Sequence, residues 1–189
     1  MTLNDLEHII RAVGAIAQVD ELIIVGSQSI LGQFPGISEP TIGTPESLLD
    51  SRAVLLQSME ADVLIPESEE KTEIIEGTIG ELSPFHTTFG YYAQGIGETT
   101  CTLPEGWKTR LVTICNENTR GVSGHCLEIH DLMISKLYAG REKDVAFFHA
   151  AAHMGLLTRA TLLERLNRTP MSDTRRQLIE NLINRGLDG

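Results

Sequence analysis

The apolar residues near the start of the chain recur at spacings of three and four, which places them on one face of an amphipathic helix. They are Leu6, Ile9, Ile10, Val13 and Ala17. Thr2 or Asn4 is the expected N-cap, because a short polar side chain accepts hydrogen bonds from the first free backbone N–H groups. Residues 22–25 then form a continuous apolar run that ends at Gly26. This pattern predicts a helix followed by a buried strand and a glycine turn.

The middle of the chain contains segments with little strand character. Residues 29–33 are expected to form a short helix or turn. Residues 34–47 are rich in proline and glycine, so they are expected to form a loop. Residues 67–82 carry isoleucines set among glutamates, which predicts an acidic surface helix.

Further strands are expected in the same region. Of the apolar stretches at 53–57 and 61–65, at least the second is predicted to be a strand, since Pro66 stops it. Residues 87–94, which are aromatic, and residues 107–115, which are β-branched, also have strand-like composition. Together with the first helix, these strands predict a mixed α/β protein.

From Leu127 onward the composition becomes helical, with apolar residues at helical spacing. Four helices are expected, over residues 129–138, 143–153, 158–166 and 172–185. Glycine or proline separates them. The chain is therefore expected to consist of an α/β core, residues 1–125, and a helical region, residues 126–189, packed on it as one compact unit.

The composition limits the classes of function. The chain has 189 residues, 41% of them hydrophobic, which fits one domain with an ordinary core. Its net charge of −11 argues against general binding of duplex DNA, although residues 156–189 carry a net charge of +2. The three cysteines have no metal-binding spacing and are expected to be reduced thiols of a cytoplasmic protein. No signal peptide or membrane-spanning run is recognised.

Gly26 and Ser27 stand where the first strand turns toward a helix. Free backbone N–H groups and a serine hydroxyl at such a turn are suited to bind a phosphate. The alternative is an ordinary strand-to-helix turn in which Ser27 serves as a cap.

Glu60 and Asp62 open the strand that ends at residue 65. Side chains two residues apart on a strand share a face, so the two carboxylates are expected to project together. Two carboxylates repel each other unless a cation lies between them, and Mg²⁺ prefers carboxylate oxygens. The alternative is a solvated pair at a strand edge.

Lys136 lies on or beside the apolar stripe of the predicted helix over residues 129–138. A lysine in that position must reach solvent or meet an anion, such as a triphosphate or the carboxylate pair. Arg141 and Asp144 follow closely. The alternative is that these three residues form a structural network of ion pairs between helices.

These three groups occur together and in order, and the combination resembles the nucleotidyltransferases of the polymerase-β-like fold. It is most similar to the group that contains the AbiEii-type toxins and related uncharacterised bacterial families. The resemblance spans about residues 22–150 and implies a mixed central sheet flanked by helices, with a helical C-terminal half.

The resemblance also implies roles for individual residues. Gly26 and Ser27 match the motif that contacts nucleotide phosphates, and Glu60 and Asp62 match the metal-binding pair. Lys136 matches a lysine that meets the triphosphate. The remaining matches are to a basic position and a downstream acid: Arg141 and Asp144.

The chain departs from the pattern of that family in two respects. The first acid is Glu60 rather than aspartate, and residues 28–59 form a long insertion that is expected to cover or block the site. Glu117 is the candidate for a third carboxylate.

The resemblance implies an enzyme that uses Mg²⁺ or Mn²⁺ to transfer a nucleoside monophosphate from a nucleoside triphosphate to a hydroxyl of RNA, protein or a small molecule. A toxin-like role with an antitoxin-like partner fits that family. One alternative is a nucleotidyltransferase fold that binds a nucleotide or a protein without turnover, and another is a purely structural protein. Other signals are assigned to packing rather than chemistry: His149, His153, Phe89, Tyr91 and Tyr92.

Overall fold

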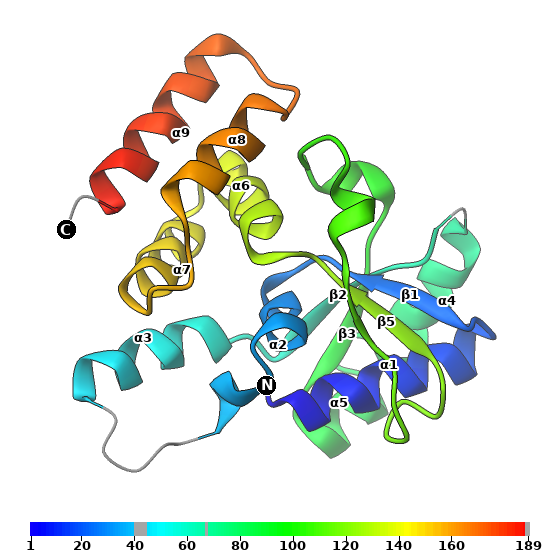
Figure 1. The fold of residues 1–189 in the computed structure, drawn as a ribbon. Helices are drawn as coiled ribbons and strands as arrows, with labels where there is room; N and C mark the ends of the chain where they lie inside the picture. Colours follow the sequence, from blue (N-terminus) through cyan, green and yellow to red (C-terminus); the bar gives the residue numbers. More distant parts are fainter. Residues whose placement is uncertain (40–44, 67, 188–189) are drawn as a thin grey trace.

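The computed structural model describes residues 1–39, 45–66 and 68–187. Over these residues the chain forms a mixed sheet of five strands in the order β3-β2-β1-β5-β4, with helices packed around it (Figure 1). The strands are β1 (Glu21–Ile24), β2 (Glu60–Leu64), β3 (Tyr92–Gly95), β4 (Val112–Ile114) and β5 (Ser123–Cys126). The predicted mixed α/β class is confirmed.

The central strand is β1. It pairs antiparallel with β2, with Ile24 opposite Val63, and parallel with β5, with Ile24 opposite Cys126. β3 pairs parallel with β2, and β4 pairs antiparallel with β5. Because β1 and β2 run in opposite directions, the end of β1 lies beside the start of β2.

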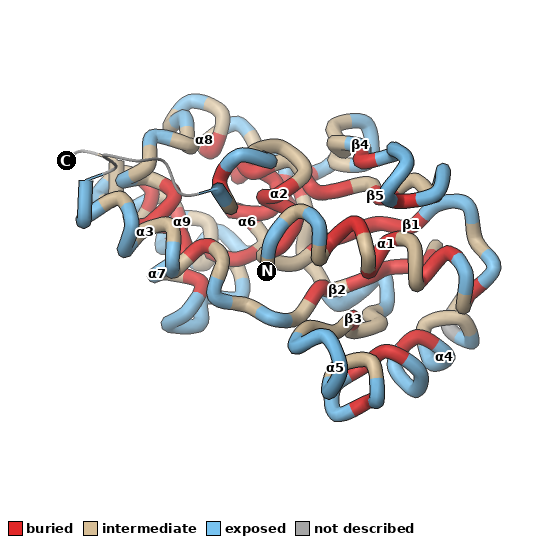
Figure 2. Tube along the Cα trace, turned by 90° about the horizontal axis from the view of Figure 1, so that it is seen from below, coloured by how far each residue is buried: buried red, intermediate tan, exposed pale blue. Residues whose placement is uncertain are grey.

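Two helices cover one face of the sheet: α1 (Leu3–Ala17) and α4 (Glu69–Ile79). Thr2 caps α1, as predicted, and accepts a hydrogen bond from the backbone N–H of Asp5. A Cβ at Gly124 of β5 would overlap the Ile10 side chain, so this glycine permits the close contact between α1 and the sheet. Figure 2 shows buried positions along β1, β2 and the inner side of α1.

The C-terminal half is helical, as predicted, with α6 (Ile129–Ala139), α7 (Glu142–His153), α8 (Arg159–Asn167) and α9 (Asp173–Gly186). Three further helices precede it: α2 (Ile30–Gln33), α3 (Glu46–Leu56) and α5 (Pro84–Phe89). α3 packs against α7, so a segment from the first half of the chain contacts the helical half (Figure 1). Residues 96–111 lie over the second face of the sheet, where Leu111 and Ile23 line a small cavity.

The passage from β5 to α6 takes only two residues, and both sides of it are hydrogen-bonded. The backbone N–H of Leu127 donates to the Ile24 carbonyl at 3.1 Å, and that of Ile129 donates to Gln33 Oε1 at 2.9 Å. The Glu128 carboxylate caps α6. The first helix of the C-terminal half is therefore fixed to β1 and α2.

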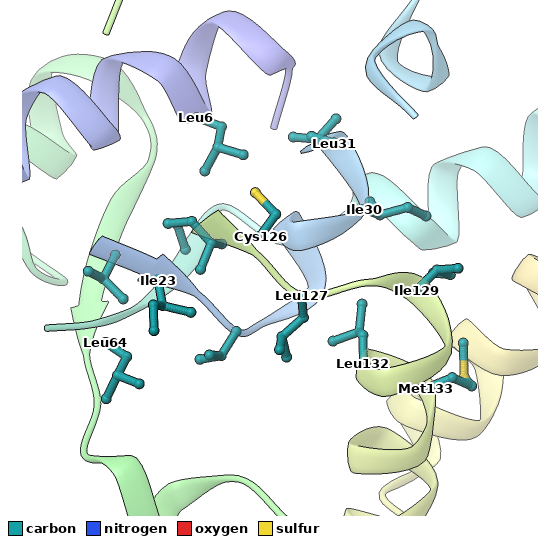
Figure 3. Close-up of a cluster of buried hydrophobic side chains, with 14 of the residues drawn as sticks. Leu6, Ile23, Ile30, Leu31, Leu64, Cys126, Leu127, Ile129, Leu132 and Met133 are labelled. Atoms are coloured by element: carbon teal, nitrogen blue, oxygen red, sulfur yellow. The ribbon is translucent and has the colours of Figure 1, made fainter. Parts of the chain in front are cut away.

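One cluster of buried apolar side chains joins the two halves. Figure 3 shows Leu6 of α1, Ile23 of β1, Leu127, and Leu132 and Met133 of α6 in this cluster. β5 spans the predicted division at residue 125, and the division itself remains a prediction. No helix among the described residues is both long and apolar enough to cross a membrane.

Two predicted strands are wrong over part of their length. Residues 84–89 form α5 because Ser83 caps the helix and Pro84 is its first residue, so only the last part of the predicted strand 87–94 belongs to β3. In the predicted strand 107–115, residues 107–110 form a 3₁₀-helix before β4.

The predicted loop over residues 34–47 contains regular structure at both ends. Pro35–Ser38 is a 3₁₀-helix and α3 begins at Glu46, while residues 40–44 lie outside the described residues. The apolar stretch 53–57 belongs to α3 rather than to a strand. β5 was not predicted, since Gly124 and His125 interrupt its apolar pattern.

Candidate functional site

The predicted phosphate turn and the predicted metal pair lie side by side. The backbone N–H of Val25, just after β1, donates to the Asp62 carbonyl of β2 at 3.1 Å. Gly26 and Ser27 follow at the start of a short 3₁₀-helix. The antiparallel pairing of β1 and β2 therefore brings together two motifs that are far apart in the sequence.

Gly26 is needed for this close approach rather than for an unusual backbone conformation. Its φ of −90° is accessible to other residues. A Cβ at this position would overlap the Oδ2 atom of Asp62, however, and would lie 2.6 Å from its Cγ atom. The glycine therefore leaves the space that the Asp62 carboxylate occupies.

Glu60 and Asp62 point from the same face of β2, as predicted, and interact with each other. Burial, together with the hydrogen bond and negative charge of Glu60, raises the pKa of Asp62 to about 7. The charges of Lys136 and Lys143 act in the opposite direction. A proton on Asp62 near neutral pH therefore reduces the repulsion between the two carboxylates, and a bound cation would have the same effect.

Glu60 has a second partner on the neighbouring strand. The Tyr92 hydroxyl of β3 donates to Glu60 Oε2 at 2.9 Å. Burial raises the pKa of the Tyr92 hydroxyl, and the hydrogen bond to Glu60 and its charge add to this effect, so the hydroxyl remains a donor. Gln94 of β3 stands opposite Asp62, so amide and phenol groups, rather than a third carboxylate, adjoin the pair on this strand.

Lys136 reaches the phosphate turn from α6. Its Nζ donates to Ser27 Oγ at 2.8 Å and to Asp144 Oδ1 at 3.3 Å, and it lies 4.6 Å from the centre of the Phe147 ring. Burial lowers the pKa of Lys136, while the Asp144 carboxylate acts to raise it. A buried cation beside a serine hydroxyl is suited to bind an anion.

Asp144 holds both predicted cations. Arg141 Nε donates to Asp144 Oδ2 at 2.7 Å, and Lys136 Nζ donates to its other oxygen. The Asp144 side chain is fully buried, at 0% exposure. Burial would raise its pKa, but Arg141 and Lys136 together lower it. Lys136, Arg141 and Asp144 thus form a network of ion pairs that joins α6 to the start of α7, and the catalytic role of Asp144 stays a prediction.

A cavity of about 770 Å³ connects these groups. The predicted residues that line it are Gly26, Ser27, Glu60, Asp62, Lys136 and Arg141. Asp144 lies behind Lys136 and Arg141 and does not line the cavity. The carboxylates occupy one wall and the cations another, so the cavity can bind a ligand that contacts both a divalent cation and basic side chains.

The long insertion forms a wall of this cavity instead of filling it. Val54 and Gln57, at the end of α3, line the cavity together with Ser58, whose carbonyl accepts a hydrogen bond from Gln28. Residues 100–102 line the cavity as well. Of the two expectations for the insertion, that it covers or blocks the site, its described residues border the cavity without filling it.

Three residues at or beside the site were given no chemical role by the sequence. Lys143 lines the cavity and has no ion-pair partner among the described residues. Its position next to Asp144 was visible in the sequence. Ser58 lines the cavity, and Tyr92 supports Glu60 from behind. The pairing of β3 with β2, which the sequence does not show, is needed to find Tyr92.

The remaining candidates lie away from the cavity. Glu117 is in the turn between β4 and β5, at the far side of the sheet from β2, so it does not accompany the carboxylate pair. His153 hydrogen-bonds Ser51 at 2.9 Å, and the His149 ring lies against Phe148. Across the part of the chain that the structure describes, no three or more His, Cys, Asp or Glu residues group to hold a metal.

Glu60 and Asp62 nevertheless fit a divalent cation that is also bound by a substrate. Their oxygens are hard ligands, both side chains line the cavity, and a cation would relieve their mutual repulsion. Mg²⁺ is commonly held by one or two carboxylates together with phosphate oxygens and water.

Comparison with known proteins gives one finding. Residues 1–178 match the model of a protein family described as "Nucleotidyltransferase of unknown function (DUF6036)". No curated protein and no solved structure matches the chain. The match includes both walls of the cavity, from the phosphate turn to α7.

Proposed function

Since the chain belongs to the family of nucleotidyltransferases of unknown function, we propose that it transfers a nucleoside monophosphate from a nucleoside triphosphate to a hydroxyl group, with Mg²⁺ or Mn²⁺. The observation that carries this proposal is the arrangement of the cavity. The carboxylates of Glu60 and Asp62 face a space that is also lined by Lys136, Arg141 and Lys143.

In this proposal, the two walls of the cavity bind different parts of a metal-triphosphate. Glu60 and Asp62 would hold the cation, which would neutralise phosphate charge and polarise the α-phosphoryl group. Ser27 and Lys136 are positioned to contact phosphate oxygens, because Lys136 Nζ already lies 2.8 Å from the Ser27 hydroxyl. Phosphoryl transfer relies mainly on such positioning and charge.

The three basic side chains that line the cavity differ in how far neighbouring carboxylates neutralise their charges. Lys136 and Arg141 share the Asp144 carboxylate, which orients both side chains. Lys143 has no such partner within the described ranges. We assign Lys143 to the phosphates that leave, since its charge acts on Asp62 without a direct ion pair and a cation there would stabilise the charge that develops on them.

The reaction would be an in-line displacement at the α-phosphorus. The acceptor oxygen forms a bond to phosphorus while the bond to the bridging oxygen of the β-phosphate breaks, so pyrophosphate leaves and the hydroxyl proton passes to water. The acceptor is an RNA end, a protein hydroxyl or a small molecule. The proposal includes a toxin-like role with an antitoxin-like partner, which rests on the resemblance to AbiEii-type toxins.

One observation favours a second candidate, a nucleotide-binding module without turnover. The pair begins with Glu60 instead of aspartate, and the neighbouring strand offers Tyr92 and Gln94 rather than a carboxylate. A site with this ligand set holds a nucleotide while positioning the cation less tightly for transfer.

The test is incubation of the purified protein with each α-³²P-labelled nucleoside triphosphate, Mg²⁺ or Mn²⁺, and extracts of RNA and protein. We expect label transfer by the wild type and a loss of about 100-fold or more in Asp62→Asn and Lys136→Met. Glu76→Gln, on the exposed side of α4, is the matched control and should transfer normally. Absence of transfer with nucleotide binding retained would favour the binding module.

A further inference from the structure

We propose that Tyr92 is a positioning residue that fixes the Glu60 carboxylate for the divalent cation. The proposal rests on the proposed function, because it presumes that Glu60 and Asp62 bind a cation. Tyr92 itself touches neither the cation nor the substrate in this proposal. Its effect passes through Glu60.

The pairing of β2 and β3 places the two side chains together. Glu60 and Tyr92 are directly opposite each other in the parallel register, so their side chains leave the same face of the sheet. The Tyr92 hydroxyl donates to Glu60 Oε2 at 2.9 Å. One carboxylate oxygen is thus held from the side of β3, and the same carboxylate also interacts with Asp62.

The Tyr92 ring is itself held by α5. The His86 ring packs against it with a distance of 4.6 Å between ring centres. His86 is fixed in turn, because its Nδ1 atom accepts a hydrogen bond at 3.1 Å from the backbone N–H of Leu82. The tyrosine hydroxyl is therefore presented to Glu60 by a chain of contacts that begins in the turn before α5.

Glu60 has a specific need for this support. A glutamate has one more rotatable bond than an aspartate, so ordering its carboxylate beside Asp62 costs additional conformational entropy. The hydrogen bond from Tyr92 fixes this bond before a cation arrives. Residues that orient metal ligands in this way commonly change metal affinity by about 10- to 100-fold when they are altered.

Tyr91, which directly precedes Tyr92 in the sequence, provides a matched control. Its hydroxyl hydrogen-bonds His8 Nδ1 at 2.8 Å, and its ring packs against Phe85 and Phe89. Tyr91→Phe therefore removes the same atom and a comparable hydrogen bond without touching Glu60. A purely structural role of the hydroxyl would affect both tyrosine variants alike.

The experiment measures Mn²⁺ binding to the full chain by the loss of the free Mn²⁺ signal in electron paramagnetic resonance, with no nucleotide present. We expect Tyr92→Phe to bind Mn²⁺ about 10-fold more weakly than the wild type. Tyr91→Phe should bind within about twofold of the wild type, because it leaves the hydrogen bond from Tyr92 to Glu60 intact. Melting temperatures of both variants report any loss of folding.

A second pair of variants separates the inference from the proposed function. In the Glu60→Gln background, Tyr92→Phe should cause no further loss of Mn²⁺ affinity, since the carboxylate it orients is gone. Wild-type affinity in Tyr92→Phe, with affinity lost in Glu60→Gln and Asp62→Asn, would overturn the role of Tyr92 alone. Unchanged affinity in Glu60→Gln and Asp62→Asn would overturn the metal site, and the role of Tyr92 with it.

Discussion

The contact between Gly26 and Asp62 limits which residue can occupy position 26. A Cβ at Gly26 would overlap Asp62 Oδ2. Since the far end of a carboxylate can rotate, an alanine at this position would turn Asp62 away from Glu60. The change would therefore disturb the Glu60–Asp62 carboxylate pair more than the fold.

For Gly26→Ala we expect a fall in nucleotidyl transfer of about 100-fold, because a displacement of a reacting group by about 1 Å has that effect. Urea unfolding should show a loss of about 1–2 kcal/mol. Gly77→Ala is the control: its Cβ would meet nothing within 4 Å on helix α4, and alanine there should raise stability by about 0.5–1 kcal/mol. Full activity in Gly26→Ala would contradict this account.

The raised pKa of Asp62 makes a second residue-scale prediction, on stability against pH. Its folded-state pKa of about 7 lies above the ordinary value of 3.8, so the folded state binds this proton more tightly than the unfolded state does. Stability from this group is therefore present at low pH and lost as the pH rises toward 7.

In the absence of divalent cations, the free energy of unfolding of Asp62→Asn relative to that of the wild type should rise by about 1 kcal/mol from pH 5 to pH 8. This value is discounted for solvent screening. Thermal unfolding at the two pH values measures this. Mg²⁺ should reduce the difference. An exposed carboxylate on α3 provides the control, as Asp50→Asn. If both variants differed from the wild type in stability by the same amount at both pH values, the raised pKa of Asp62 would not affect stability and the prediction would be wrong.

At the scale of elements, a buried ion cluster joins α6 to two other segments. Asp131 on α6 has no exposed surface and accepts two hydrogen bonds from Arg110, at 2.8 and 2.9 Å. Arg165 of α8 lies 3.3 Å from the same carboxylate. Arg110 ends the 3₁₀-helix that precedes β4, so one aspartate fixes the segment over the second sheet face and the third helix of the C-terminal half.

Removal of this charge should be costly because it leaves Arg110 without its buried partner. We expect Asp131→Asn to lower the free energy of unfolding by about 3–5 kcal/mol. The exposed pair of Glu98 with Lys108 is the comparison, and Glu98→Gln should change stability by less than about 1 kcal/mol. Denaturant unfolding of the two variants checks the difference, and equal values would refute the importance of burial here.

The accuracy of the predictions for individual elements follows the physical signals available in the sequence. The four C-terminal helices were predicted because apolar spacing and glycine ends agree there. Residues 87–89, the end of α5, were predicted as part of a strand because aromatic residues follow one another there, although Ser83, Pro84 and Gly90 carry the start and stop signals of a short helix. β5 has four residues, and Gly124 and His125 give it no strand-like alternation.

At the scale of the whole molecule, the fold supplies what the sequence does not contain, which is the distance between motifs. The sequence placed Gly26, Ser27, Glu60, Asp62 and Lys136 in one site only through the family resemblance. The structure brings them to one cavity through the antiparallel pairing of β1 with β2 and the position of α6. Tyr92 could not be assigned, because its role depends on strand register.

The short passage from β5 to α6 has a mechanical consequence. Leu127 and Ile129 are bonded to β1 and α2 on either side of Glu128, so the chain has no slack there about which the helical half could swing. Lys136, eight residues further along on α6, is therefore held at a fixed distance from the sheet. We infer that a change in the width of the cavity would involve its other walls, the end of α3 and residues 100–102, rather than a rotation of the helical half.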